Sequence, residues 1–166
     1  LSEDGSAGFV MTFRDISEQL QTEERLAHLA HHDPLTDLPN RRLLSERLDY
    51  EIVRSRRHGE WFALHLIDLD DFKNVNDRYG HPVGDKLLVS LADRMRSVVR
   101  LSDTVARVGG DEFAIIQVGV DEREDAAVLA RKLLFECSRP VHLNGFELFP
   151  AVTIGVSFFA GDQTED

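Results

Sequence analysis

The spacing of apolar residues predicts a helix, a strand and a second helix in the first part of the chain. Within residues 41–57, leucine and isoleucine recur at four-residue intervals, as they do on one face of a helix. Residues 61–68 form an almost continuous apolar run, which is typical of a strand covered on both faces. A leucine-rich stripe with helical spacing then predicts a helix at residues 85–100.

The second half of the chain carries shorter elements separated by turn signals. Gly109-Gly110 and Asn144-Gly145 are both dipeptides that favour tight type I′ hairpins. The expected elements are strands at 104–108 and 112–118, a helix at 124–137, a hairpin within 141–149 and a strand at 151–158. This order predicts an α+β fold with a ferredoxin-like β-α-β-β-α-β core, of the nucleotidyl cyclase or palm type, and one extra hairpin.

Two segments precede this core. Residues 8–14 read as a strand whose sheet would lie upstream, because a lone strand is not stable. Residues 15–32 predict a connector helix, which the prolines of residues 33–40 end. Its apolar spacing is interrupted, so two interpretations stay open: a linker packed on its own domain, or a short coiled coil that couples an upstream sensor to the core.

Composition narrows the class of partner. The chain has 166 residues and a net charge of −11, which argues against a nucleic acid polymer as partner because such binding needs a basic face. A single nucleotide held through a metal ion remains compatible with that charge. The single cysteine, Cys137, excludes an internal disulfide and is expected to be a buried small hydrophobe. We expect a cytoplasmic location, either alone or as the cytoplasmic part of a membrane-bound sensor protein.

The first acidic cluster follows the predicted buried strand. Asp68, Asp70 and Asp71 stand where that strand ends, and an unpaired charge at Asp68 would be costly there. A hard divalent cation would offset this cost. A calcium loop of the EF-hand type is excluded, because Lys73 and Tyr79 occupy the positions that need glycine and glutamate. The alternative is a solvated acidic loop that caps the next segment.

The second acidic cluster is Asp111-Glu112, directly after the Gly109-Gly110 turn. In the expected core the first and second parallel strands lie centrally, which would place Asp68 and Asp111 on either side of one cation site. Two carboxylates and a backbone carbonyl are a typical protein share of Mg²⁺ coordination, and substrate phosphates supply the remaining ligands.

Residues between the two clusters suit a nucleotide. Lys73 is a plausible phosphate contact beside the metal. A carboxylate such as Asp85 accepts from N1–H and N2–H₂ of guanine, and an amide such as Asn76 donates to O6 or accepts from N2–H₂. From spacing alone the plainer interpretation is favoured, in which Asn76 forms a turn and Asp85 caps a helix.

Several motifs together resemble one family. Gly109-Gly-Asp-Glu-Phe113 is the signature sequence of the GGDEF family of diguanylate cyclases. The stretches 68–85 and 33–42 are similar to its companion motifs, and the resemblance covers residues 28–158. Residues 8–24 resemble the end of a PAS sensor domain. The expected organisation is therefore the end of a PAS-like sensor at 1–14, a connector helix at 15–32 and a GGDEF domain at 33–166 that stops before the family's last helix.

The resemblance implies condensation of two GTP molecules into cyclic di-GMP with release of pyrophosphate. It implies Mg²⁺ or Mn²⁺ as the metal, held by Asp68, the Leu69 carbonyl, Asp111 and Glu112. Catalytic roles fall on Asp111, Glu112 and Lys73. The expected substrate contacts are Asn76, Asp85, Asp71, Phe72, Gly109 and Gly110.

The resemblance also implies regulation and partners. Arg100 and Asp103 stand five residues before the glycine pair, which is the offset of the family's inhibitory product site, although such a pair is often only a surface ion pair. Each domain would hold one GTP, so a homodimer is expected, with an upstream PAS sensor and a downstream EAL phosphodiesterase domain as further partners. The alternative function is a GTP-binding regulatory module that controls such an EAL domain.

Overall fold

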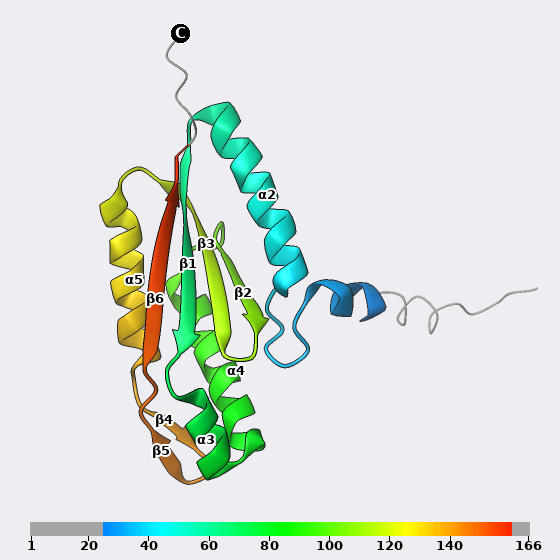
Figure 1. Ribbon diagram of the computed structural model, residues 1–166, viewed down its shortest axis with the longest axis vertical. Helices are drawn as coiled ribbons and strands as arrows, with labels where there is room; N and C mark the ends of the chain where they lie inside the picture. The colour runs from blue at the N-terminus through cyan, green and yellow to red at the C-terminus, as the bar shows by residue number, and fades with distance from the viewer. Residues whose placement is uncertain (1–24, 161–166) are drawn as a thin grey trace, which may run out of the picture.

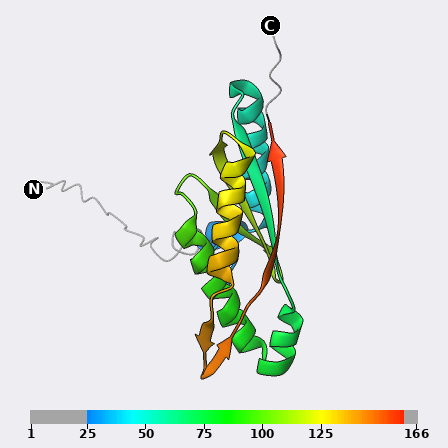
Figure 2. The same cartoon turned by 90° about the vertical axis from the view of Figure 1, so that its left-hand side faces the viewer.

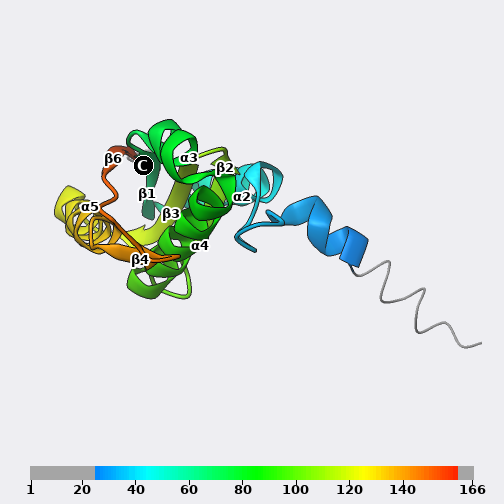
Figure 3. The same ribbon diagram turned by 90° about the horizontal axis from the view of Figure 1, so that it is seen from below.

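The structure is a computed structural model that describes residues 25–160, so the predictions for residues 1–24 and 161–166 lie outside the described residues. Residues 25–31 are helical and lead away from the domain on the side of α2 (Arg41–His58), as Figure 3 shows. The helix α2 begins and ends as its spacing predicts. Its N-cap Asn40 accepts a hydrogen bond from Leu43 N, and Gly59 closes its C-terminus with a left-handed φ of 68°.

One four-stranded antiparallel sheet forms the centre of the molecule (Figure 1). Its strands are β1 (Trp61–Leu69), β2 (Thr104–Gly109), β3 (Glu112–Val120) and β6 (Val152–Phe159), in the order β2-β3-β1-β6. This order confirms the α+β, ferredoxin-like core. The expectation that the first two parallel strands are central is wrong, because β3 lies between β1 and β2 and leaves β2 at the edge.

The helices α4 (His81–Val98) and α5 (Arg123–Cys137) lie on one face of the sheet (Figure 2), and their side chains contribute to the main core. The apolar stripes of both helices pack there against β1 and β3, as their periodicity predicts. Its fully buried members include Ile67, Leu87, Leu91, Met95, Ile115 and Leu133. Cys137 is also fully buried, and burial raises the pKa of its thiol to about 11, so it is the small hydrophobe that was expected.

The other face of the sheet is covered only in part. Residues of α2 pack against Phe62 and the neighbouring strands in a smaller core. Beyond α2, Leu66 is 55% exposed and Asp68 is exposed, so the prediction that residues 61–68 are covered on both faces is wrong for the end of the strand. The same strand carries one buried polar side chain, His65, whose Nε2 lies 2.9 Å from Oε1 of Gln117.

A helix that the sequence did not predict lies between β1 and α4. It is α3 (Phe72–Tyr79), and α4 begins at His81 rather than at Asp85. Gly80 and Pro82 indicate a break, but Gly80 is the joint between the helices, with φ 85°, and Pro82 lies in the first turn of α4, where its missing N–H is not needed. Asp85 therefore lies inside α4, and its interpretation as a helix cap is wrong.

The extra hairpin forms as predicted from β4 (Val141–Leu143) and β5 (Phe146–Leu148). Asn144 and Gly145 both have positive φ, 52° and 84°, which a type I′ turn requires. The hairpin lies at the end of the molecule that carries α3 (Figure 1). Within the described residues, no helix is both long and apolar enough to cross a membrane.

Candidate active site

The register of β1 and β3 brings the two acidic clusters together. Asp68 pairs directly with Glu112, and Ile67 pairs with Phe113 behind it. Because side chains alternate across a sheet, Asp68 and Glu112 lie on the open face while Ile67 and Phe113 lie in the core. The sheet thus presents carboxylates from both central strands at one end.

The hairpin turn differs from the prediction by one residue. Gly109 still belongs to β2 and pairs with Glu112, so Gly110 and Asp111 form the turn instead of Gly109 and Gly110. A register shift between Arg107 and Gly109 accompanies this offset, and both glycines have positive φ, 159° at Gly109 and 52° at Gly110. Asp111 therefore stands at the tip of the hairpin, beside the end of β1.

The acidic residues of this end influence one another. Partial desolvation, followed by the charges of Asp111, Glu112 and Asp70, raises the pKa of the Asp68 carboxyl above its ordinary value. Arg41 balances little of this charge, because its Nη2 lies 3.9 Å from Glu112 Oε2 in an exposed pair. The site therefore carries excess negative charge that a cation would relieve.

The donor set suits Mg²⁺ or Mn²⁺. Carboxylate oxygens and the backbone carbonyl of Leu69 are all hard oxygen donors. Across residues 25–160, no group of three or more His, Cys, Asp or Glu side chains is placed so that it could hold a metal ion, so the structure does not bring Asp68, Asp111 and Glu112 together as a three-carboxylate site.

The start of α3 follows this acidic end directly. Asp71 is its N-cap, with a left-handed φ of 57°, and its Oδ1 accepts a hydrogen bond from Asn74 Nδ2 at 3.2 Å. Phe72 and Lys73 form the first turn of the helix, where backbone N–H groups have no intrahelical acceptor. Such N–H groups, together with the exposed ammonium of Lys73, are suited to bind phosphate.

The proposed base-reading residues lie on two packed helices. Asn76 is on α3 and the exposed Asp85 is on α4. Oδ1 of Asn76 is buried and has no hydrogen-bond partner among the described residues. The space beside it is occupied by the backbone of Gly84, the neighbour of Asp85.

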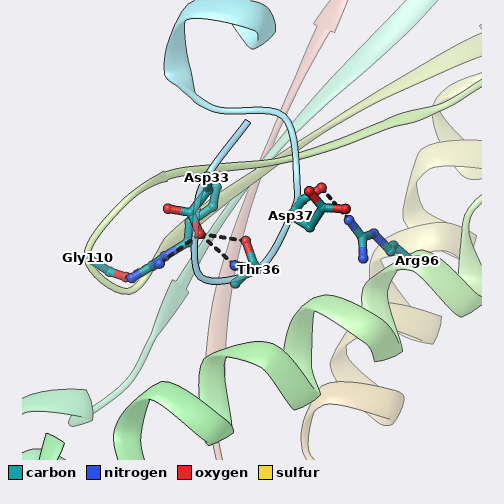
Figure 4. Close-up of polar contacts among 6 residues, drawn as sticks. Asp33, Thr36, Asp37, Arg96 and Gly110 are labelled. Atoms are coloured by element: carbon teal, nitrogen blue, oxygen red, sulfur yellow. Dashed lines mark hydrogen bonds and ion pairs between the residues drawn. The ribbon is translucent and has the colours of Figure 1, made fainter. Parts of the chain in front are cut away.

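Sequence reasoning missed Arg107, which fixes the hairpin turn. Its Nε and Nη2 donate to Gly110 O at 3.0 and 2.7 Å, and its Nη1 donates to Asp33 Oδ1 at 2.9 Å. Figure 4 shows Asp33 and Gly110 facing this guanidinium, with Thr36 also bonded to Asp33. Burial acts to raise the pKa of Asp33, but hydrogen bonds from Thr36 and Arg107 outweigh it and lower the pKa below its ordinary value. The feature of the sequence that could have identified this role is an arginine two positions before the Gly109-Gly110 pair.

One cavity, of about 460 Å³, lies at the acidic end of the sheet beside Asp68 and Glu112. A second cavity, of about 510 Å³, lies between the 33–40 loop and the end of α4. Asp103 is held there, because its Oδ2 accepts from Arg100 N at 2.9 Å and its Oδ1 accepts from Val118 N at 3.2 Å. The Arg100 side chain is exposed and pairs with no carboxylate within residues 25–160, so these two side chains do not form the surface ion pair of the alternative interpretation. Arg96 anchors the loop by donating to Asp37 O at 2.6 Å (Figure 4).

Comparison with known proteins gives the same family throughout. The family model described as "Diguanylate cyclase, GGDEF domain" matches residues 30–166. The bifunctional diguanylate cyclase/cyclic di-GMP phosphodiesterase MucR of Pseudomonas aeruginosa is 44% identical over 142 residues, which cover 86% of this chain and 21% of MucR. Diguanylate cyclase TpbB of the same species is 41% identical over 143 residues, which cover 85% of this chain and 33% of TpbB. The chain thus spans a fifth to a third of the length of these relatives.

Solved structures agree with the sequence relatives. The GGDEF domain of TpbB, 40% identical, superposes with a TM-score of 0.75 over 78% of this chain and 76% of that one. The coiled coil and GGDEF domain of DgcB from Caulobacter crescentus, solved in complex with c-di-GMP, is 25% identical with a TM-score of 0.78 over 87% of this chain and 77% of that one. The signature residues at the hairpin, the matching fold and these relatives lead to one conclusion: the chain belongs to the GGDEF family of diguanylate cyclase domains.

Proposed function

We propose that this domain condenses two GTP molecules into cyclic di-GMP and releases two pyrophosphates. The observation that carries the proposal is the pairing of Asp68 with Glu112, with Asp111 at the adjacent hairpin tip. In each half-reaction the 3′-oxygen of one GTP bonds to the α-phosphorus of the other. The bond from that phosphorus to the pyrophosphate breaks, and the 3′-hydroxyl proton is released.

The acidic end of the sheet would hold the divalent ion. Asp68, the Leu69 carbonyl and Asp111 are its proposed ligands, and Glu112 either adds a further oxygen or accepts the 3′-hydroxyl proton. A bound Mg²⁺ or Mn²⁺ neutralises phosphate charge and polarises the α-phosphate. Without a cation, these carboxylates would repel the triphosphate.

The neighbouring segments would bind the rest of GTP. Lys73 and the backbone N–H groups after Asp71, at Phe72 and beyond, hold phosphate oxygens. The backbone at Gly109 and Gly110 allows close approach of the substrate because neither residue has a side chain. Asn76 and Asp85 bind the guanine edge, with the carboxylate accepting from N1–H and N2–H₂.

Assembly and regulation complete the proposal. Each domain holds one GTP, so two domains must face each other, and the reaction requires a homodimer. Cyclic di-GMP would bind at the second cavity through Arg100 and Asp103 and inhibit the enzyme. In the whole protein we propose a PAS-like sensor ending near residue 14, a connector helix over 15–32 and the cyclase domain from 33 onward, with a downstream EAL domain as a further partner.

The test is incubation of the protein with GTP and Mg²⁺, followed by chromatographic separation and mass analysis of the products. We expect cyclic di-GMP and pyrophosphate in a 1:2 ratio, and a specific activity that rises with protein concentration as the dimer forms. Asp111→Asn should abolish product, whereas Asp121→Asn, an exposed aspartate at the other end of β3, should leave turnover unchanged.

A second candidate function has support among the relatives. The cyclic di-GMP phosphodiesterase NbdA of Pseudomonas aeruginosa is 36% identical over 143 residues, which cover 85% of this chain and 18% of NbdA. A chain that binds GTP tightly but forms no cyclic di-GMP would overturn the cyclase proposal. That result would favour a regulatory GGDEF module acting on a phosphodiesterase domain.

A further inference from the structure

We propose that Gly84 is a positioning residue for nucleobase recognition, because it holds the Asn76 amide in place from the neighbouring helix. The inference rests on the proposed guanine site formed by Asn76 and Asp85. It adds Gly84 to this site as a third residue, which contributes by having no side chain.

Position 84 requires glycine because there is no room for a side chain. Gly84 is buried in the first turns of α4, facing α3. A Cβ at this position would overlap Oδ1 of Asn76 and would lie 3.0 Å from Cγ of Asn76 and 3.2 Å from Cζ of Phe72. Its φ is not in the left-handed region, unlike that of Gly80 at 85°, so the backbone conformation at Gly84 does not itself require glycine.

The Asn76 amide is the group that this space admits. Its Oδ1 is enclosed and has no partner among residues 25–160, whereas buried polar atoms are normally hydrogen-bonded. Because the oxygen end is enclosed against Gly84, the NH₂ end remains available to a ligand. That end donates, so it matches a carbonyl acceptor such as guanine O6.

Asp85 completes a donor and acceptor pattern that distinguishes guanine from adenine. Its carboxylate accepts from N1–H and N2–H₂ of guanine while the Asn76 amide donates to O6. Adenine presents an amino group in place of O6 and an unprotonated N1, so both contacts would be lost. A methyl group at position 84 would displace the Asn76 amide and weaken this discrimination.

The experiment measures binding of 3′-deoxy-GTP and 3′-deoxy-ATP by calorimetry in the presence of Mg²⁺. These nucleotides lack the attacking hydroxyl, so no turnover complicates the measurement. We expect Gly84→Ala to weaken 3′-deoxy-GTP binding about tenfold or more and to leave 3′-deoxy-ATP binding unchanged, so that the preference between them falls. Alanine is the better helix former, so a loss of this kind would not reflect a weaker helix.

The control is Ser97→Ala, near the other end of α4. Ser97 is exposed and its hydroxyl donates only to Arg94 O within its own helix, so its substitution should change neither affinity. A second comparison uses Asn76→Ala. If Gly84 acts through Asn76, adding Gly84→Ala to Asn76→Ala should cause no further loss of 3′-deoxy-GTP affinity.

Two results would overturn the inference. One is an unchanged guanine preference in folded Gly84→Ala, and the other is a full additive loss in the double variant. If Gly84→Ala alone does not fold, the double variant supplies the test. Asn76→Ala removes the overlapping oxygen and should restore folding, so a double variant that stays unfolded would contradict the contact between Gly84 and Asn76. Wild-type protein that prefers 3′-deoxy-GTP but makes no cyclic di-GMP from GTP would refute the cyclase proposal and leave this inference standing.

Discussion

Asp33 and Arg107, separated by 74 positions in the sequence, form an ion pair with Oδ1 and Nη1 2.9 Å apart. Only 19% and 13% of their side chains are exposed. The same guanidinium holds the carbonyl of Gly110, which precedes Asp111. The loop that follows the helical residues 25–31 is therefore fastened to the turn that carries a proposed metal ligand.

Breaking this contact should impair both stability and activity. Arg107→Lys keeps the charge but loses the planar group that bonds Asp33 and Gly110 together. We expect a loss of about 2 kcal/mol in the free energy of unfolding and at least a tenfold fall in cyclase rate. Urea unfolding and product assays measure the two effects. The control is Arg131→Lys in the exposed pair with Glu124, which should cost no more than about 0.5 kcal/mol. Equal losses in both variants would contradict the role given to Arg107.

The buried histidine of β1 should make stability depend on pH. Burial lowers the pKa of His65, although the hydrogen bond with Gln117 and the charge of Asp103 oppose this shift. Below pH about 6.5 the unfolded chain gains a proton that the folded state resists, so stability should fall with falling pH. His65→Leu should remove this slope in urea titrations between pH 7 and 5. His142→Leu, an exposed control, should retain it, and an unchanged slope in His65→Leu would contradict the assignment.

The acidic cluster should lower the stability of the metal-free protein while it supports cyclase activity. Asp68→Asn removes one of several like charges at the end of the sheet, so we expect the melting temperature without divalent ions to stay the same or rise. We also expect Mg²⁺-dependent cyclase activity to fall by at least 100-fold, and EDTA to abolish wild-type activity. Asp49→Asn on the exposed part of α2 is the control. Full activity in Asp68→Asn would refute the proposed metal site.

The second cavity should govern product inhibition separately from catalysis. Arg100→Ala removes an exposed guanidinium from the cavity that the fixed carboxylate of Asp103 also lines. We expect initial rates to remain within twofold of wild type and added cyclic di-GMP no longer to slow the reaction. Arg131→Ala should remain inhibited. Inhibition that persists unchanged in Arg100→Ala would place the inhibitory site elsewhere.

The sequence predicted the fold where local patterns and tertiary structure agree. Apolar spacing located α2, α5 and all four strands of the sheet to within two residues, and Asn144-Gly145 predicted the small hairpin. The prediction failed at α3, where Gly80 and Pro82 signal a break although they serve as a joint and a first-turn residue. Glycine and proline occur both in loops and at a joint between two packed helices, so local residues do not distinguish the two cases. Here the close packing of α3 against α4 at Gly84 distinguishes them.

The roles of the candidate-site residues stay a prediction, and their geometry was only partly predictable from the sequence. The sequence indicated that Asp68 and Asp111 would meet, yet it assigned the wrong central strands and the wrong turn residues. Arg107, which adjoins the register shift beside Gly109, contacts Asp33 at a separation of 74 positions, and local spacing does not predict such a long-range contact. The open face near Leu66 depends in the same way on how far α2 extends across the sheet.

The pairing of Asp68 with Glu112 has a consequence for how this domain tolerates mutation. A slip of one residue between β1 and β3 would turn Asp68 into the interior and Ile67 out to water, because successive side chains alternate across a sheet. Misalignment of the acidic end therefore carries the penalty of a buried charge and an exposed isoleucine. Selection that maintains the core therefore also maintains the alignment of the carboxylates. A variant that folds with this core keeps Asp68 and Glu112 side by side.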